Sequence, residues 1–263
     1  MTAAGLLRTE RRDRVALLTL DDPGRRNSLT LPLVAEIVAA VEALEADDGV
    51  GAIVVTGAPP AFCAGADLGD LAGPAGPTLT DEARAASLRQ IYDGFLRLAD
   101  SPLPVVAAVN GPAVGAGFNL ALAADVRIAG ESARYLGRFL ELGLHPGGGH
   151  TWLLERLVGP QTAAAVVLFG ETLDGPRSVE VGLSWRCVPD DELIEAAVAM
   201  AARAASAPLP LARRVKQTLR GLPAIDDHAT AVEHELVPQV WSAGQPFFAD
   251  RLKALQARVQ KRG

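Results

Sequence analysis

The stretch that decides the fold is PVVAAVNGPAVGAGFNL, residues 104–120. Its first part, residues 104–109, is a continuous apolar run of the kind that forms a strand buried on both faces. A turn of small residues follows, and the pattern after the turn indicates that a helix begins there. The N–H groups at the start of a helix lack partners within it, and the helix dipole favours negative charge. The stretch therefore predicts a strand, a tight turn and a helix start that accepts an anionic group.

The chain on either side alternates short apolar runs with helical patterns. Residues 15–20, 52–56 and 126–129 are predicted strands. Thr30 is a predicted helix N-cap, followed by apolar residues at helical spacing up to residue 44. A second apolar stripe, over residues 88–98, predicts another helix. This alternation of strands and helices is typical of an α/β core.

Two further segments are predicted loops, and the end of the chain is predicted to be helical. Residues 69–77 (GDLAGPAGP) are rich in glycine and proline, and residues 146–149 (PGGG) precede an apolar helical start. From residue 190 onward the patterns are helical, punctuated by prolines and glycines. We predict an α/β core over residues 1–195 and a helical C-terminal region over residues 196–263.

The bulk properties restrict the function classes. A chain of 263 residues with 49% apolar side chains can bury a large core, and a net charge of −6 argues against a nucleic-acid partner. No apolar run is long enough to cross a membrane, and residues 1–14 lack a signal-peptide pattern. Cys63 and Cys187 form neither a disulfide framework nor a zinc motif. Two widely separated cysteines of this kind predict reduced thiols in a cytoplasmic protein.

A second motif, AFCAGAD at residues 61–67, follows the strand predicted over residues 52–56. Its small residues let a ligand approach the backbone closely, so the N–H of Ala66 is a candidate donor to a ligand oxygen. A purely structural turn would show the same residues. The chain has no Gly-Lys-Ser/Thr after its glycine-rich turn, no GxGxxG in register and no GxSxG, which excludes the phosphate-loop, dinucleotide and nucleophile-elbow motifs.

Taken together, these motifs resemble the crotonase (enoyl-CoA hydratase/isomerase) family. AFCAGAD at residues 61–67, the stretch at 104–117, GLHPGGGHT at 143–151 and RLVG at 156–159 occur in the family's order. RRNSL at residues 25–29 matches the motif near the coenzyme A site. The resemblance covers residues 15–189 and is loose beyond them. It implies an α/β fold, a crotonase-like β-β-α spiral core with a helical C-terminal trimerisation region, assembled as a homotrimer or homohexamer.

The resemblance also implies a ligand and a site. The ligand is an acyl-CoA thioester, and no metal, nicotinamide or flavin cofactor is expected. The thioester oxygen is placed at the backbone N–H groups of Ala66 and Ala116, an oxyanion hole that stabilises a thioester enolate. Losing one such donor typically costs about 10²–10³ in rate. Coenzyme A is placed along Arg26, Ser28, Ala64, Asp67 and Leu68.

The chain differs from the family at the residues that move protons. The two glutamates of the hydratases correspond to Asn119 and Phe139, and the acid that isomerases often carry corresponds to Gly147. None of these residues titrates, whereas a positioned acid or base contributes about 10²–10⁴ to a rate. Asn119 keeps the ability to orient a water or to polarise a carbonyl.

Three nearby groups are candidates for the missing proton transfer. Glu141 would share the face of Phe139 on a strand but would point elsewhere on a helix, where it would be a solvated or ion-paired carboxylate. Arg138 is the candidate for such an ion pair. His145, beside the expected acyl pocket, is either an acid–base group or a packed histidine. His150 is predicted to begin the following helix.

Two classes of function stay open. One is a lyase or isomerase that acts on acyl-CoA with rearranged acid–base groups. The other is a protein that binds acyl-CoA and has lost hydratase activity. The family resemblance favours an enzyme, while the contrast between intact coenzyme A motifs and substituted proton-transfer positions favours binding over efficient hydration.

Overall fold

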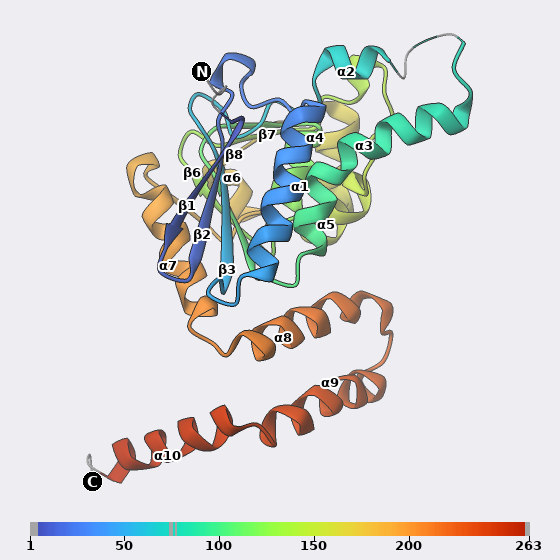
Figure 1. The fold of residues 1–263 in the computed structure, drawn as a ribbon. Coiled ribbons are helices and arrows are strands. Elements are labelled where there is room, and N and C mark those ends of the chain that lie inside the picture. Colours follow the sequence, from blue (N-terminus) through green and yellow to red (C-terminus); the bar gives the residue numbers. More distant parts are fainter. Residues whose placement is uncertain (1–4, 74–75, 77, 261–263) are drawn as a thin grey trace.

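The computed structural model describes residues 5–73, 76 and 78–260, and its centre is a six-stranded sheet (Figure 1). The first strand pairs antiparallel with the second, and the other neighbours pair in parallel. In spatial order the strands are β1 (Leu7–Arg12), β2 (Val15–Leu20), β3 (Ala52–Gly57), β4 (Val105–Val109), β6 (Val126–Gly130) and β9 (Arg186–Val188). A smaller sheet consists of β5 (Pro112–Val114), β7 (Arg134–Leu136) and β8 (Leu173–Asp174).

The central strands β2, β3, β4 and β6 are buried on both faces, whereas the edge strand β1 is largely exposed. Successive side chains of a strand point to opposite sides of the sheet, so each face has its own core. On one side Leu18, Leu20, Ile53 and Val55 belong to a core shared with several helices. They include α1 (Leu31–Ala46), α3 (Asp81–Asp100) and α4 (Ala116–Leu122). On the other side the alternate residues, such as Leu17, pack with α7 (Leu193–Ala205). The continuous apolar runs of the sequence thus reflect a sheet that is covered twice.

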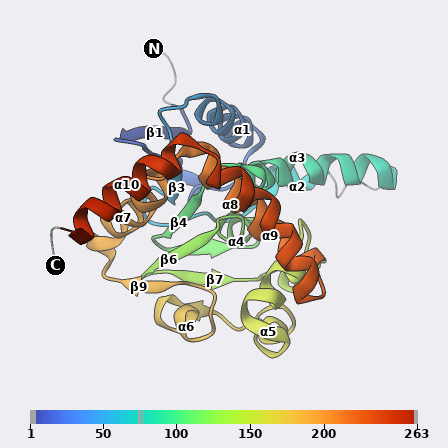
Figure 2. The ribbon, with the colours of Figure 1, turned by 90° about the horizontal axis from the view of Figure 1, so that it is seen from below.

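The remaining helices complete the body and extend away from it. Three of them, α2 (Leu68–Ala72), α5 (His150–Phe169) and α6 (Gly175–Glu180), belong to the body. Short 3₁₀ helices lie at Pro23–Arg25, Leu140–Leu142, Asp190–Glu192 and Leu222–Ala224. The C-terminal helices α8 (Leu209–Gly221), α9 (His228–Ala243) and α10 (Pro246–Gln260) form an arm beside the body (Figures 1 and 2).

The α/β fold class and the four predicted strands are confirmed, and so are the two long helices predicted before residue 101. The side chain of Thr30 accepts a hydrogen bond from the N–H of Leu33, as expected of an N-cap. The loop predicted over residues 69–77 is wrong in its first part. Helix α2 begins at Leu68, because the Asp67 carboxylate caps it by accepting from the N–H of Gly69 at 2.9 Å. Residues 74, 75 and 77 of that segment lie outside the described residues.

Two features bear on the predicted organisation of the chain. Helix α7 runs across the predicted boundary at residue 195 and packs on the large sheet, while α8–α10 form the outer arm. Within the described part of the chain, no helix has both the length and the apolar character needed to cross a membrane. The cytoplasmic location stays a prediction.

Candidate active site

The two glycine-rich motifs lie against one another in the structure. Cys63, in the middle of AFCAGAD, forms a parallel bridge with Ala113 of β5. The N–H of Cys63 donates to the carbonyl of Pro112 at 3.1 Å, and the N–H of Val114 donates to the carbonyl of Cys63 at 3.0 Å. These bonds extend the small sheet by one short segment. They bring residues 64–67 beside the start of α4, although about fifty residues separate them in sequence.

Two glycines permit this close approach. A Cβ atom at Gly117 would lie 2.2 Å from the carbonyl oxygen of Cys63, which is far inside any van der Waals contact. Gly65 has a φ of +98°, and a Cβ there would lie 2.6 Å from the carbonyl oxygen of Val114. Any larger residue at either position would push the two motifs apart.

The close packing leaves two backbone donors at a cavity. Ala116 is the first residue of α4, and Ala66 follows Gly65 on the opposing motif. Both residues line the same cavity. Among the residues that the structure describes, neither N–H has a hydrogen-bond partner, whereas the neighbouring N–H groups of Gly115 and Asp67 are paired. The geometry provides two converging motifs, each with a free donor.

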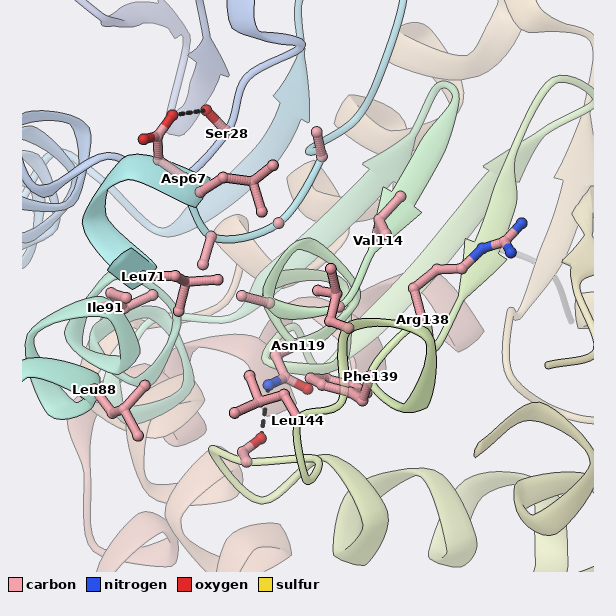
Figure 3. Close-up of a pocket in the computed structure, with 18 of the residues that line it drawn as sticks. Ser28, Asp67, Leu71, Leu88, Ile91, Val114, Asn119, Arg138, Phe139 and Leu144 are labelled. Carbon is pink, nitrogen blue, oxygen red and sulfur yellow. Dashed lines mark hydrogen bonds between the residues drawn. The ribbon is translucent and has the colours of Figure 1, made fainter. Parts of the chain in front are cut away.

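The cavity has a volume of about 530 Å³ and a mainly apolar wall (Figure 3). Five leucines, Leu68, Leu71, Leu88, Leu142 and Leu144, together with Ile91, Val114 and Phe139 supply much of that wall. At one end the Ser28 hydroxyl lies 3.4 Å from the Asp67 carboxylate, to which it donates. Such a cavity, apolar with a few polar groups, is the usual form of a small-molecule site.

The predicted coenzyme A residues gather at this end of the cavity with one exception. Ser28, Ala64, Asp67 and Leu68 line it. Arg26 is not among the lining residues; its carbonyl accepts from the N–H of Ala64 at 3.0 Å and so supports the loop. The neighbouring Arg25 lines the cavity instead.

Asn119 lies one helical turn after Ala116 and lines the cavity, although its side chain is almost fully buried. Its Nδ2 donates to the carbonyl of Gly147 at 2.9 Å. The dashed line that starts at Asn119 in Figure 3 marks this bond. Its Oδ1 lies 2.7 Å from Nδ1 of His150. His150 begins α5, as predicted, and is 1% exposed. Burial lowers the pKa of its imidazole to about 4, so the ring is neutral at physiological pH.

The other acid–base candidates lie at the rim. Glu141 is in the 3₁₀ helix at Leu140–Leu142, exposed, and forms an ion pair with Arg138. This arrangement is the ion-paired alternative of the two that the sequence left open. His145 also lines the cavity but is exposed, with its Nδ1 2.7 Å from the carbonyl oxygen of Pro146.

Sequence reasoning missed one residue and one contact. Tyr92 lines the cavity, and its hydroxyl lies so close to Gly147 that a Cβ there would be 2.1 Å away. On the sequence it belonged to an apolar helical stripe and looked like a core residue. The missed contact is that of His150 with Asn119, two residues that are 31 positions apart in the sequence. A polar residue at the N-terminus of a predicted helix, next to PGGG, was the available signal.

Two further observations restrict the kinds of reactive group that the described part of the site contains. Burial raises the pKa of the Cys63 thiol to about 12, so this cysteine inside the AFCAGAD motif is no nucleophile at neutral pH. In the part of the chain that the structure describes, no three His, Cys, Asp or Glu side chains cluster closely enough to hold a metal ion. Among the described residues, the arrangement offers two unpaired backbone N–H groups to a ligand oxygen at the wall of an apolar cavity.

The fold and the paired motifs define the chain's family. A family described as Enoyl-CoA hydratase/isomerase matches residues 10–239. The chain belongs to the enoyl-CoA hydratase/isomerase (crotonase) family.

The relatives that it resembles include hydratases and isomerases. The chain is 47% identical to the probable enoyl-CoA hydratase EchA14 of Mycobacterium tuberculosis over 93% of this chain and 94% of the relative. It is 38% identical to the 1,2-epoxyphenylacetyl-CoA isomerase of Escherichia coli, over 74% of each chain. The crystal structure of an enoyl-CoA hydratase from Bacillus anthracis superimposes with a TM-score of 0.87 at 29% identity, covering 97% of this chain and 96% of that one. These names agree with the expectation of a lyase or isomerase.

Proposed function

We propose that the protein binds acyl-CoA thioesters and holds the thioester oxygen at the N–H groups of Ala66 and Ala116. The observation that carries the proposal is that both N–H groups lack partners among the described residues and belong to one apolar cavity. A thioester oxygen gains negative charge when an enolate forms at the neighbouring carbon. Two donors fixed by backbone geometry stabilise that charge without reorganising.

The rest of the cavity suits the two ends of such a ligand. Ser28, Ala64, Asp67 and Leu68 form the end that we assign to coenzyme A, with Arg25 supplying a positive charge beside the predicted Arg26. The leucine-rich wall suits an acyl group, because apolar surface removed from water contributes about 25 cal/mol per Å². No cofactor enters this chemistry, since the thioester itself supplies the electron sink.

The proton-transfer residues separate the two candidate functions. Asn119, Phe139 and Gly147 occupy the positions where the resemblance places the family's acids, and Glu141 is engaged with Arg138. We therefore propose that hydration of straight-chain enoyl-CoA is very slow. An enzyme that stabilises an enolate of another acyl group is the function the geometry supports best. The alternative is an acyl-CoA-binding protein without hydratase activity, which the ion-paired state of Glu141 favours.

We further propose that the chain assembles as a trimer or hexamer through its C-terminal arm. Helices α8–α10 carry exposed apolar side chains, an arrangement that is typical of an interface. The exposed set is Val215, Leu219, Val232, Leu236, Val237, Val240, Phe248, Leu252, Leu255 and Val259.

Calorimetry with butyryl-CoA, and with free coenzyme A as the matched control, tests the binding proposal. Butyryl-CoA is expected to bind more tightly than free coenzyme A, because only the thioester offers an oxygen to the two N–H groups. Absence of heat and of competition at millimolar ligand would contradict the proposal.

Exchange of the α-protons of butyryl-CoA in deuterated water, followed by NMR, separates the two functions. Exchange indicates an enzyme that forms the enolate, and tight binding without exchange indicates the binding protein.

A further inference from the structure

A buried histidine connects the two positions where the resemblance places the hydratase glutamates. His150 Nδ1 lies 2.7 Å from Oδ1 of Asn119. The ring of Phe139 packs against the imidazole with centroids 4.8 Å apart, and Phe118 packs on it at 5.1 Å, nearly perpendicular. The imidazole is therefore held by two aromatic rings while one nitrogen contacts the amide that lines the cavity.

The contacts fix both the orientation of the amide and the tautomer of the histidine. The carbonyl of Gly147 only accepts, so the group of Asn119 that faces it must be the NH₂ group. The oxygen of the amide consequently faces His150, and the neutral ring must carry its proton on Nδ1 in order to donate to it. A flipped amide would place oxygen against oxygen at Gly147 and lose that bond, and its contact with His150 would survive only in the other tautomer.

We propose that His150 is a positioning residue that holds the Asn119 amide as a neutral hydrogen-bond donor to the acyl group of the bound thioester. One N–H of Asn119 is used by Gly147, and the second has no partner among the described residues. Asn119 and Ala116 are three residues apart on α4, so they share a helix face with a rise of about 4.5 Å between them. A thioester oxygen at Ala116 thus places the next carbons of the acyl chain beside the amide.

This arrangement selects among acyl groups. A buried donor left without an acceptor is unfavourable, and a ligand that supplies the acceptor recovers part of that cost. Sites built to hydrogen-bond a ligand group discriminate strongly against the analogue that lacks it. The favoured ligand is an acyl-CoA with an acceptor oxygen on its β-carbon. The inference rests on the proposed binding of acyl-CoA and adds the group that the acyl cavity recognises.

The test compares two ligands that differ by one oxygen, 3-hydroxybutyryl-CoA and butyryl-CoA, by calorimetry. We expect the wild-type protein to prefer the hydroxylated ligand by about two- to tenfold, the range of one net hydrogen bond. His150→Leu removes the contact that holds the oxygen of the amide and is expected to abolish the preference. His150→Asn places an N–H donor at the δ position and is expected to retain it. Asn119→Ala removes the amide itself and is also expected to abolish the preference, so it replaces His150→Leu in the test if that variant does not fold.

The outcomes separate this inference from a purely structural role and from the binding proposal. A structural role predicts that His150→Leu weakens both ligands equally, with an unchanged ratio and no rescue by His150→Asn. Equal affinity of the wild-type protein for the two ligands would also overturn the inference while leaving acyl-CoA binding intact. Failure of both ligands to bind would instead remove the proposed function on which the inference rests.

Discussion

Acidification is expected to destabilise the protein through His150 at a pH where carboxylates are still largely ionised. Burial lowers the pKa of this imidazole from its ordinary 6.5 to about 4. Between these values the unfolded chain binds a proton that the folded chain does not, so stability falls as the pH falls. The full difference amounts to about 3 kcal/mol, at about 1.4 kcal/mol for each unit of pKa. Most of it, about 2 kcal/mol, is lost between about pH 7 and about pH 5.

The measurement is urea unfolding of the wild-type protein and of His150→Leu at a series of pH values and one protein concentration. Leucine cannot titrate, so the variant keeps every other pH-dependent term and loses this one. Subtracting the two curves removes the contribution of carboxylates whose pKa is lowered, such as Asp47 and Asp190. The wild-type protein should lose about 2 kcal/mol more than the variant on going to about pH 5.

Parallel curves for the two proteins would refute the reasoning, since they would mean that the imidazole has the same pKa folded and unfolded. If acidification instead stabilised the wild-type protein relative to the variant, the pKa of the imidazole would be raised on folding, which is opposite to the expected shift. In that case the folded state would hold the imidazolium, and the Nδ1 donor could no longer be assigned from a neutral ring.

Three other outcomes are expected. The wild-type protein should hydrate crotonyl-CoA far more slowly than about 10 per second, measured by the loss of enoyl absorbance. The double variant Asn119→Glu with Phe139→Glu should restore part of the roughly 10²–10⁴-fold rate increase that a positioned carboxylate contributes. An ordinary hydratase rate in the wild-type protein would contradict this. Gly117→Ala should abolish binding of butyryl-CoA in calorimetry, because the new Cβ would lie 2.2 Å from the Cys63 carbonyl oxygen. The matched control is Gly24→Ala, whose Cβ would meet only a side-chain oxygen at 3.8 Å, and this variant should bind normally. Sedimentation at micromolar concentration should show three or six chains, and a clean monomer would contradict assembly through α8–α10.

The sequence predicted the parts of the fold in which local pattern and environment agree. The runs at β2, β3, β4 and β6 are mainly apolar, with Thr19, Thr56 and the buried Arg127 as the polar exceptions, and they form strands that are buried on both faces. Strand β1 was not predicted because LRTERR is polar and lies at the sheet edge, where hydrogen bonds to β2 decide its conformation. Helix α2 was missed for a related reason, since its cap depends on one carboxylate within a stretch rich in glycine.

The candidate site likewise contains parts that the sequence could predict and parts that only the fold determines. The two motifs could be found because each needs small residues in sequence, and Gly65 and Gly117 show why. Their contact, through the bridge of Cys63 with Ala113, depends on the fold. The role of His150 depends on tertiary structure even more, because nothing in its local pattern indicates which residue its ring nitrogen contacts.

The contacts of His150 also explain why restored glutamates should recover only part of the hydratase rate. Asn119 meets a donor on one side and a carbonyl oxygen on the other, and only an amide satisfies both. A carboxylate at position 119 would face the Gly147 oxygen without a proton between them. A glutamate at position 139 would also remove the ring that packs on the imidazole, and its burial would raise its own pKa. Because the two new carboxylates would act on one water and disturb one histidine, their effects should be far from additive.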